Sequence, residues 1–295
     1  MFPTFTPFTI QTEPSIHIHG LIGPVSPTKP PLLLLHGFPQ TLHIWNKTAP
    51  ALTSHYNVVL IDIRGYGQST AARGADYSKT AMARDCVAVM QQHGFATFAV
   101  CGHDRGARIA HKLLVDHPRV VTKALLLDIC PTRAMYAAAD AAFAKAYHHW
   151  FWLVAPEPLP ETMILGDPRR VLECLMGGKA GPVGLEKVFG VEPFERYVEC
   201  ARDEETVHAW CEDYRAAAEV DCEEQRRDAE EGRLIEAPIR VLWARHGVCE
   251  KMFDTLGEWR KVSRAEVSGE AVESGHYIPE EVPDVLLKHI HEFLV

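Results

Sequence analysis

The residues best suited to carry out a reaction lie in segment 98–108, FAVCGHDRGAR, where an apolar run meets a helical pattern. The run 98–101 predicts a short buried strand, and the spacing of the apolar residues after the segment predicts a helix. Asp104 would lie on the turn between them, and Gly102 and Gly106 flank it as in a G-x-nucleophile-x-G elbow. A carboxylate at this position can displace a leaving group from a saturated carbon and form an alkyl ester. Dehalogenation and epoxide opening are reactions of this kind.

Two arginines follow Asp104 and indicate an anionic substrate. Arg105 would be the first residue of the helix and Arg108 lies three positions later, so both project from one side of the first turn. Paired guanidinium groups at a helix N-terminus can bind a carboxylate, and they would also keep Asp104 ionised. The alternative is that both arginines are solvated or salt-bridged surface residues. Beside a predicted nucleophile, the carboxylate receptor is the favoured interpretation.

Turnover through an alkyl ester needs a base that activates water and a partner that orients this base. His276 is the predicted base, because it follows a brief predicted strand and precedes segment 280–294, whose amphipathic pattern predicts the last helix. His36 and His103 flank predicted backbone turns, and we interpret them as structural residues.

Asp128 is the predicted partner of this base. It ends the apolar run 124–127, and catalytic side chains of parallel sheets gather at the carboxyl ends of strands. The loop 243–247, after the next predicted strand, offers no carboxylate, and Glu250 and Asp254 come later in the chain. The alternative role for Asp128 is to cap the segment that follows it.

Short apolar runs recur along the chain and predict buried parallel strands. Helical patterns separate them, which is typical of an α/β fold with a mostly parallel, twisted sheet and helices on both faces. Segments 8–12 and 15–19 alternate apolar and polar residues and predict half-exposed antiparallel strands ahead of the first run. The apolar runs are 32–35, 58–61, 98–101, 124–127 and 239–243.

The pattern changes between about residues 132 and 234. Ala-rich and aromatic-rich helical stretches occur there, broken by prolines and glycines, and no further run of the buried-strand type follows until residue 239. We therefore expect a helical insertion in the α/β unit. The predicted domains are a core made of residues 1–132 and 235–295, and a helical cap at residues 133–234.

Two loops after predicted strands bear on the site. The loop 36–40, HGFPQ, can direct the backbone N–H of Phe38 toward the reacting centre. The loop 62–69, DIRGYGQS, has the glycines and polar residues of a tight, hydrogen-bonded turn. Asp62 and Arg64 in this loop are predicted to form a structural ion pair and to have no catalytic role.

The composition restricts the partners and the location. The chain has 295 residues, 47% of them hydrophobic, and a net charge of −9 at pH 7, which argues against binding to nucleic acid or anionic membranes. No apolar run approaches the roughly 20 residues of a membrane span. No secretory signal is evident, and the eight cysteines lack a C-x-x-C pair, so we expect a reducing, cytoplasmic location.

No metal or organic cofactor is expected. His17 and His19 would share one face of a predicted strand, but no third ligand accompanies them, so solvent exposure is the favoured interpretation. Ester formation and hydrolysis need only side chains and water.

The chain resembles the fluoroacetate dehalogenase (haloacetate dehalogenase) family of α/β-hydrolases, almost from end to end. The resemblance implies an α/β-hydrolase fold with a helical cap, with Asp104 as nucleophile, His276 as base and Asp128 as its partner. It also implies that Arg105 and Arg108 bind the carboxylate of a haloacid. The segments that carry the likeness are HGFPQ at 36–40, DIRGYGQS at 62–69, GHDRGAR at 102–108, LDICPT at 127–132, HW at 149–150, EDYR at 212–215 and ESGH at 273–276.

The resemblance implies the remaining contacts too. His149, Trp150 and Tyr214 would hold the departing halide, because fluoride leaves a dry site only if hydrogen-bond donors meet it. Without the resemblance, His149 and Trp150 would be interpreted as packed residues. The backbone N–H groups of Phe38 and Arg105 would stabilise the oxyanion of ester hydrolysis. The implied protein is a homodimer that converts a haloacetate or short 2-haloacid, such as fluoroacetate or chloroacetate, to the 2-hydroxy acid and a halide ion.

Two departures from the family pattern bear on selectivity. Ala107 replaces a glycine of the elbow and should leave the turn intact. The stretch MGGK at 176–179 lacks the aromatic residue that the family tends to place near the halide, which predicts a wider pocket and less selection for fluoride.

Three alternatives share this scaffold. Epoxide hydrolases and haloalkane dehalogenases also use an Asp nucleophile and a base, but the former usually carry Trp after the nucleophile and the latter need no charged clamp. Arg105 and Arg108 therefore favour a haloacid. A ligand receptor without catalysis is the third alternative, and the presence of nucleophile, base and acid together argues against it.

Overall fold

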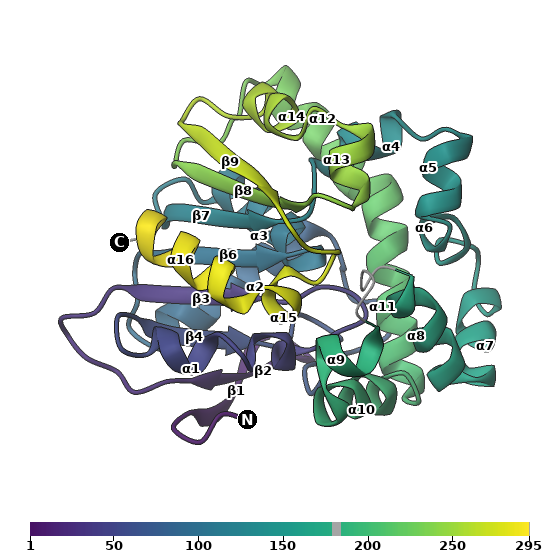
Figure 1. The fold of residues 1–295 in the computed structure, drawn as a ribbon, viewed down its shortest axis with the longest axis horizontal. Coiled ribbons are helices and arrows are strands. Elements are labelled where there is room, and N and C mark those ends of the chain that lie inside the picture. Colours follow the sequence, from purple (N-terminus) through teal and green to yellow (C-terminus); the bar gives the residue numbers. More distant parts are fainter. Residues whose placement is uncertain (179–183, 295) are drawn as a thin grey trace.

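The computed structural model describes residues 1–178 and 184–294, whose strands form one mixed, mostly parallel sheet (Figure 1). The strand order is β1-β2-β4-β3-β6-β7-β8-β9, and β5 pairs with β2. Strand β2 is antiparallel to β1, β4 and β5, whereas the pairs from β4 to β9 are parallel. The predicted fold class is confirmed. The strands are β1 (Thr6–Glu13), β2 (Ile16–Ile22), β3 (Pro31–Leu35), β4 (Asn57–Ile61), β5 (Thr70–Ala71), β6 (Phe98–His103), β7 (Val121–Leu127), β8 (Ile239–Ala244) and β9 (Val267–Val272).

Helices cover both faces of the sheet, and the side chains of β3 alternate between them. Leu33 and Leu35 pack in one hydrophobic cluster, and Leu32 and Leu34 in another. In Figure 1, α16 lies in front of the sheet and α2 and α3 lie behind it. The covering helices are α1 (Ala49–Leu52), α2 (Lys79–Gln92), α3 (Arg105–Asp116), α13 (Val248–Met252), α14 (Thr255–Lys261), α15 (Ile278–Glu281) and α16 (Pro283–Phe293).

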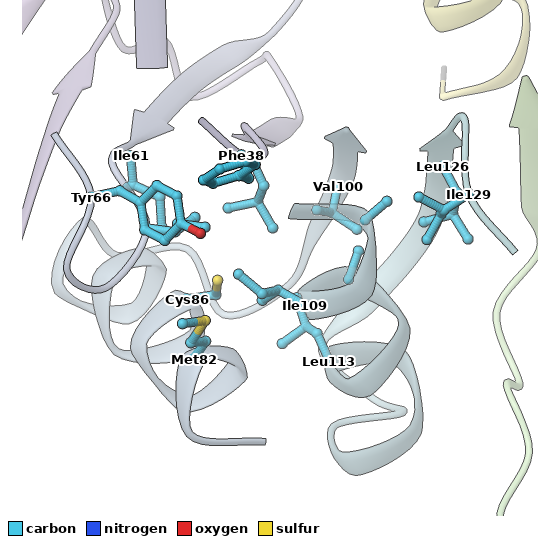
Figure 2. Close-up of a cluster of buried hydrophobic side chains, with 14 of the residues drawn as sticks. Phe38, Ile61, Tyr66, Met82, Cys86, Val100, Ile109, Leu113, Leu126 and Ile129 are labelled. Carbon is cyan, nitrogen blue, oxygen red and sulfur yellow. The ribbon is translucent and has the colours of Figure 1, made fainter. Parts of the chain in front are cut away.

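Figure 2 shows the cluster beneath the predicted elbow. Met82 and Cys86 of α2 lie beside Ile109 and Leu113 of α3, and Phe38 lies on the same side of the sheet. All five side chains are buried. Because close-packed apolar groups resist displacement, this cluster fixes the start of α3, where Asp104 is placed.

The described chain between β7 and β8 is helical, and most of its helices gather to one side of the sheet (Figure 1). We refer to this set of helices as the insert. A π-helical turn, Ala217–Asp221, joins its last two helices. The helices of the insert are α4 (Thr132–Ala137), α5 (Ala141–Ala146), α6 (His149–Trp152), α7 (Leu159–Gly166), α8 (Pro168–Gly177), α9 (Leu185–Phe189), α10 (Val191–Cys200), α11 (Glu204–Ala216) and α12 (Cys222–Glu230).

The last helix, predicted as one segment at 280–294, is divided in two. The short helix α15 ends at Glu281, and α16 begins at Pro283. Proline has no N–H to continue the first helix, but its fixed φ suits the first position of a new one. The break lies a few residues after His276.

The ion pair predicted between Asp62 and Arg64 is wrong. The Asp62 carboxylate accepts hydrogen bonds from the backbone N–H groups of Leu42 at 2.8 Å and Gln68 at 3.0 Å. Arg64 pairs instead with Asp85 of α2, with 2.7 Å between Nε and Oδ2. One amide from the loop, that of Gln68, and one from outside it, that of Leu42, satisfy the carboxylate, and Arg64 pairs with a different buried acid.

Several other features bear on the predicted location and cofactors. The eight cysteines are free thiols, and His17 and His19 are half-buried on β2. Within the described part of the chain, no helix is long and apolar enough to cross a membrane. In the same residues, no group of three or more His, Cys, Asp or Glu side chains is arranged to hold a metal ion.

Candidate active site

Asp104 lies between β6 and α3, as the elbow predicts. Its φ of +48° is in the left-handed region, which side chains rarely adopt. A Cβ on Gly106 would lie 2.5 Å from the backbone oxygen of Leu35, and one on Gly102 would lie 2.6 Å from that of Gly106, so both positions need glycine. The Phe38 backbone N–H donates to Asp104 Oδ1 at 3.0 Å. The turn thus presents one carboxylate oxygen to a backbone donor.

His276 and Asp128 lie beside this carboxylate. His276 Nδ1 donates to Asp128 Oδ2 at 2.6 Å, and His276 Nε2 lies 3.9 Å from Asp104 Oδ2. With its proton on Nδ1, the ring can accept a proton at Nε2, which has no hydrogen-bond partner among the described residues. Asp128 Oδ1 accepts from the Ala244 backbone N–H at 2.9 Å, which holds the acid in place. This geometry suits a base that acts on water beside Asp104.

The other two histidines near the site have structural contacts. His103 Nε2 donates to the carbonyl oxygen of His276 at 2.8 Å, and His36 Nε2 accepts from the Ile63 backbone N–H at 3.1 Å. Burial lowers the pKa of His103 to about 3 and that of His36 to about 4, so both rings are neutral near pH 7. The structural interpretation of these histidines agrees with their surroundings.

Arg108 is a buried cation whose hydrogen bonds in the described part of the chain go to uncharged groups. Its guanidinium donates to Thr132 Oγ1 at 2.9 Å, to the Cys130 carbonyl oxygen at 3.4 Å and to Met135 Sδ at 3.3 Å. Its Nε is buried without a hydrogen-bond partner, and it forms no ion pair with a described carboxylate. A buried charge without an opposite charge beside it is unfavourable unless a ligand supplies that charge. The surface interpretation of this arginine does not fit its burial.

Arg105 is also buried, but it is paired. Its Nε and Nη2 donate to the Asp213 carboxylate at 2.8 Å and 2.6 Å, and its guanidinium lies 4.3 Å from the centre of the Tyr214 ring. Asp213 belongs to α11, and no role was predicted for it. The two arginines therefore differ: Asp213 neutralises Arg105, whereas no carboxylate among the described residues pairs with Arg108.

The surroundings of Asp104 keep it ionised. Burial alone would raise its pKa, but nearby His276, Arg108, His103 and Arg105 lower it well below the ordinary range. The largest lowering of this pKa comes from His276, and the two arginines add a permanent positive charge. An ionised carboxylate in a site largely closed to water can act as a nucleophile.

Two of the predicted halide-binding residues, His149 and Tyr214, lie beside Phe38, and the third, Trp150, lies beside Arg108. The rings of His149 and Phe38 are stacked with 6.1 Å between their centres, and the Tyr214 ring meets Phe38 edge-on at 5.1 Å. The Arg108 guanidinium lies 4.7 Å from the centre of the Trp150 ring. All three predicted residues are buried. The insert thus places the Tyr214 phenol beside Arg105 and the Trp150 indole beside Arg108, with the His149 imidazole next to Tyr214.

A cavity of about 470 Å³ reaches His276 from the side of α5 and α13. Its wall includes Asp128, Tyr147, Gly178 and Lys251. Asp104 is not part of that wall, but 9% of its side chain remains accessible, so water can reach it. Lys179 of the MGGK stretch lies outside the described residues.

These features define the α/β-hydrolase class, and the model of the alpha/beta hydrolase fold matches residues 30–164. A fluoroacetate dehalogenase from Burkholderia sp is 39% identical over 271 residues, which cover 90% of this chain and 87% of that protein. The chain belongs to the fluoroacetate dehalogenase family of these hydrolases.

Two further relatives place the chain more broadly. The alpha/beta hydrolase structure ALR0039 from Nostoc sp PCC 7120 has a TM-score of 0.93 and 40% identity, and the match covers 100% of this chain and 99% of that one. A soluble epoxide hydrolase from Corynebacterium sp. (strain C12) is 27% identical over 265 residues, which cover 87% of each chain. The chain is therefore a hydrolase of a group that includes enzymes with different substrates.

Proposed function

We propose that this protein hydrolyses a haloacetate or a short 2-haloacid to the 2-hydroxy acid and a halide ion. The observation that carries the proposal is Arg108, a buried cation that forms no ion pair with a described acid and lies near the ionised Asp104. A substrate carboxylate would form an ion pair with this guanidinium. The similarity to a fluoroacetate dehalogenase supports the same substrate class.

In the first step, the substrate carboxylate binds Arg108 and Arg105. Asp104 attacks the α-carbon from the side opposite to the halogen, so a C–O bond forms as the carbon–halogen bond breaks and the halide takes the bonding electron pair. His149, Trp150 and Tyr214 donate hydrogen bonds to the departing halide. The product of this step is an ester on Asp104.

In the second step, His276 takes a proton from water, which attacks the carbonyl carbon of the Asp104 ester. Asp128 stabilises the imidazolium that forms. The oxyanion is met by the backbone N–H groups of Phe38, which already donates to Asp104, and Arg105. The bond between the carbonyl carbon and the ester oxygen breaks, the 2-hydroxy acid leaves with the proton, and the Asp104 carboxylate is restored.

Replacing Arg108 with methionine tests the carboxylate receptor. Loss of a charge-assisted, buried contact should raise KM for chloroacetate by about tenfold to a hundredfold. Steady-state halide release measures this. Arg133→Met, on the exposed side of the same region, is the matched control and should keep the wild-type KM. An unchanged KM in Arg108→Met would remove the main support for a haloacid substrate.

The low pKa of Asp104 gives a pH prediction. A carboxyl whose pKa is depressed in the folded state stays ionised as the pH falls through its ordinary value, about 4, and its contribution to stability is lost only below that value. The rate of the first halide release, measured with enzyme in excess, should therefore show no acid limb near pH 4. A midpoint near that pH would indicate an ordinary aspartic acid.

The other activities of related hydrolases are separated by substrate. The 27% identity to a soluble epoxide hydrolase favours epoxide opening as the second candidate, since Asp104 and His276 would serve both reactions. A panel of fluoroacetate, chloroacetate, a haloalkane and an epoxide decides among them. Turnover of the two neutral compounds alone would contradict the proposal, and turnover of none would favour a ligand receptor.

The finer features follow from the same proposal. We propose that the insert, predicted at residues 133–234, acts as the cap over the site, and that Gly177 and Gly178 widen the pocket, since Gly178 lies in the wall of the cavity. Free thiols suit the proposed cytoplasmic location. The proposed homodimer rests on the family alone, and light scattering of the purified protein tests it.

A further inference from the structure

Arg105 and Asp213 form a buried ion pair that joins the core to the insert. Arg105 Nε donates to Asp213 Oδ2 at 2.8 Å, and Arg105 Nη2 donates to Oδ1 at 2.6 Å and to the Asp213 carbonyl oxygen at 2.7 Å. Both side chains are buried. Three bonds from two nitrogens fix the plane of the guanidinium. The third nitrogen, Nη1, takes no part in the bonds to Asp213.

The core also holds Asp213 from its other side. Lys79 Nζ, at the start of α2, donates to Asp213 Oδ1, and the Tyr66 hydroxyl donates to Oδ2 at 2.7 Å. Lys79 Nζ lies 3.3 Å from Asp221 Oδ2 in the π-helical turn. Burial raises the pKa of Asp213, but Arg105 and Lys79 lower it by more than burial raises it, so the carboxylate stays ionised. Two buried cations and two buried carboxylates thus balance in charge.

We propose that Asp213 is a positioning residue, which holds the Arg105 guanidinium in the orientation that receives the substrate carboxylate and keeps it away from Asp104. This inference rests on the proposed function. Without Asp213, Arg105 would be a second buried cation beside the ionised nucleophile, and the two would attract each other. A direct pair between Arg105 and Asp104 would block both the receptor and the nucleophile.

The place of Asp213 in the chain extends this role. It precedes Tyr214, a proposed halide donor, on the buried side of α11. One turn of this helix would therefore position the groups at both ends of the substrate, and the bonds from Lys79 and Tyr66 to Asp213 tie this turn to the core.

The test compares halide release from chloroacetate by wild type, Asp213→Asn, Arg105→Met and the double variant. Asp213→Asn should raise KM by about tenfold, since Arg105 loses two charge-assisted bonds. The double variant should have the KM of Arg105→Met, because the proposed effect of Asp213 on substrate binding passes through Arg105. A purely structural role predicts effects that multiply.

Two further variants distinguish an effect on the position of Arg105 from an effect on the stability of the fold. Asp221→Asn removes a buried carboxylate that contacts Lys79 but not Arg105, so it should lower the melting temperature and leave KM unchanged. Asp213→Glu keeps the charge but displaces the carboxylate by one methylene, so it should fold and still show a raised KM.

The outcomes are distinguishable. Wild-type halide release together with an unchanged KM in Asp213→Asn, or in Asp213→Glu if the asparagine variant does not fold, overturns the positioning role alone. Multiplying effects in the double variant overturn it as well. Absence of halide release by the wild type from every haloacid overturns the proposed function and this inference together.

Discussion

Replacing Asp104 with asparagine is expected to abolish halide release from chloroacetate. The carboxamide keeps the size of the side chain and an oxygen for the Phe38 backbone N–H, but it is a far weaker nucleophile. Loss of a residue that forms the covalent intermediate lowers kcat by about 10,000-fold or more. Initial rates of halide release, with enough enzyme to detect the residual activity, measure this.

The asparagine variant should remain folded. Asparagine, like aspartate, tolerates the left-handed φ of +48° at this position better than most residues with a side chain do, so the melting temperature should stay close to that of the wild type. A folded variant that releases halide at more than about a hundredth of the wild-type rate would mean that another group forms the ester or that water attacks the α-carbon directly.

Replacing His276 with asparagine should stop the reaction halfway. Asp104 can still displace the halide, but no base remains at the position where His276 Nε2 lies, 3.9 Å from Asp104 Oδ2. The variant should release one halide per chain in a burst and then turn over about 10,000-fold more slowly than the wild type. Intact-mass analysis should show one added carboxymethyl group, located at residue 104 by peptide mapping.

His289→Asn is a matched control for this experiment. His289 is buried on α16, with its ring next to Glu270 and not next to Asp128. This variant should turn over normally and carry no adduct. Equal loss in both variants, without an adduct in either, would show that the effect of His276→Asn reflects damage to the fold.

The fold could be predicted because its signals are local. In runs such as Leu32–Leu35, every residue is apolar, so both faces of the strand are apolar. In the structure their side chains belong to two clusters, one on each face of the sheet. The elbow could also be predicted from local residues, since Gly102 and Gly106 occupy positions where neighbouring atoms leave no space for a Cβ. The division of the last helix at Pro283 was overlooked, although proline is the residue that most often marks such a break.

The partners of buried charges could not be predicted in the same way. The sequence places Arg64 two residues from Asp62, but the structure pairs it with Asp85 on α2. Arg105 and Asp213 are more than a hundred residues apart, and only the docking of the insert brings them together. A weak signal existed, because Asp213 falls among the apolar residues of α11 and an acid in such a position needs a buried partner.

The source of the oxygen in the product tests the central claim most directly. A single turnover of chloroacetate is run in heavy-oxygen water with enzyme in excess. If Asp104 forms an ester that water then cleaves at the aspartyl carbonyl, the first 2-hydroxy acid contains ordinary oxygen from Asp104, and the heavy isotope is found in the peptide that contains residue 104. Heavy oxygen in the first product, with an unlabelled Asp104, would contradict the account.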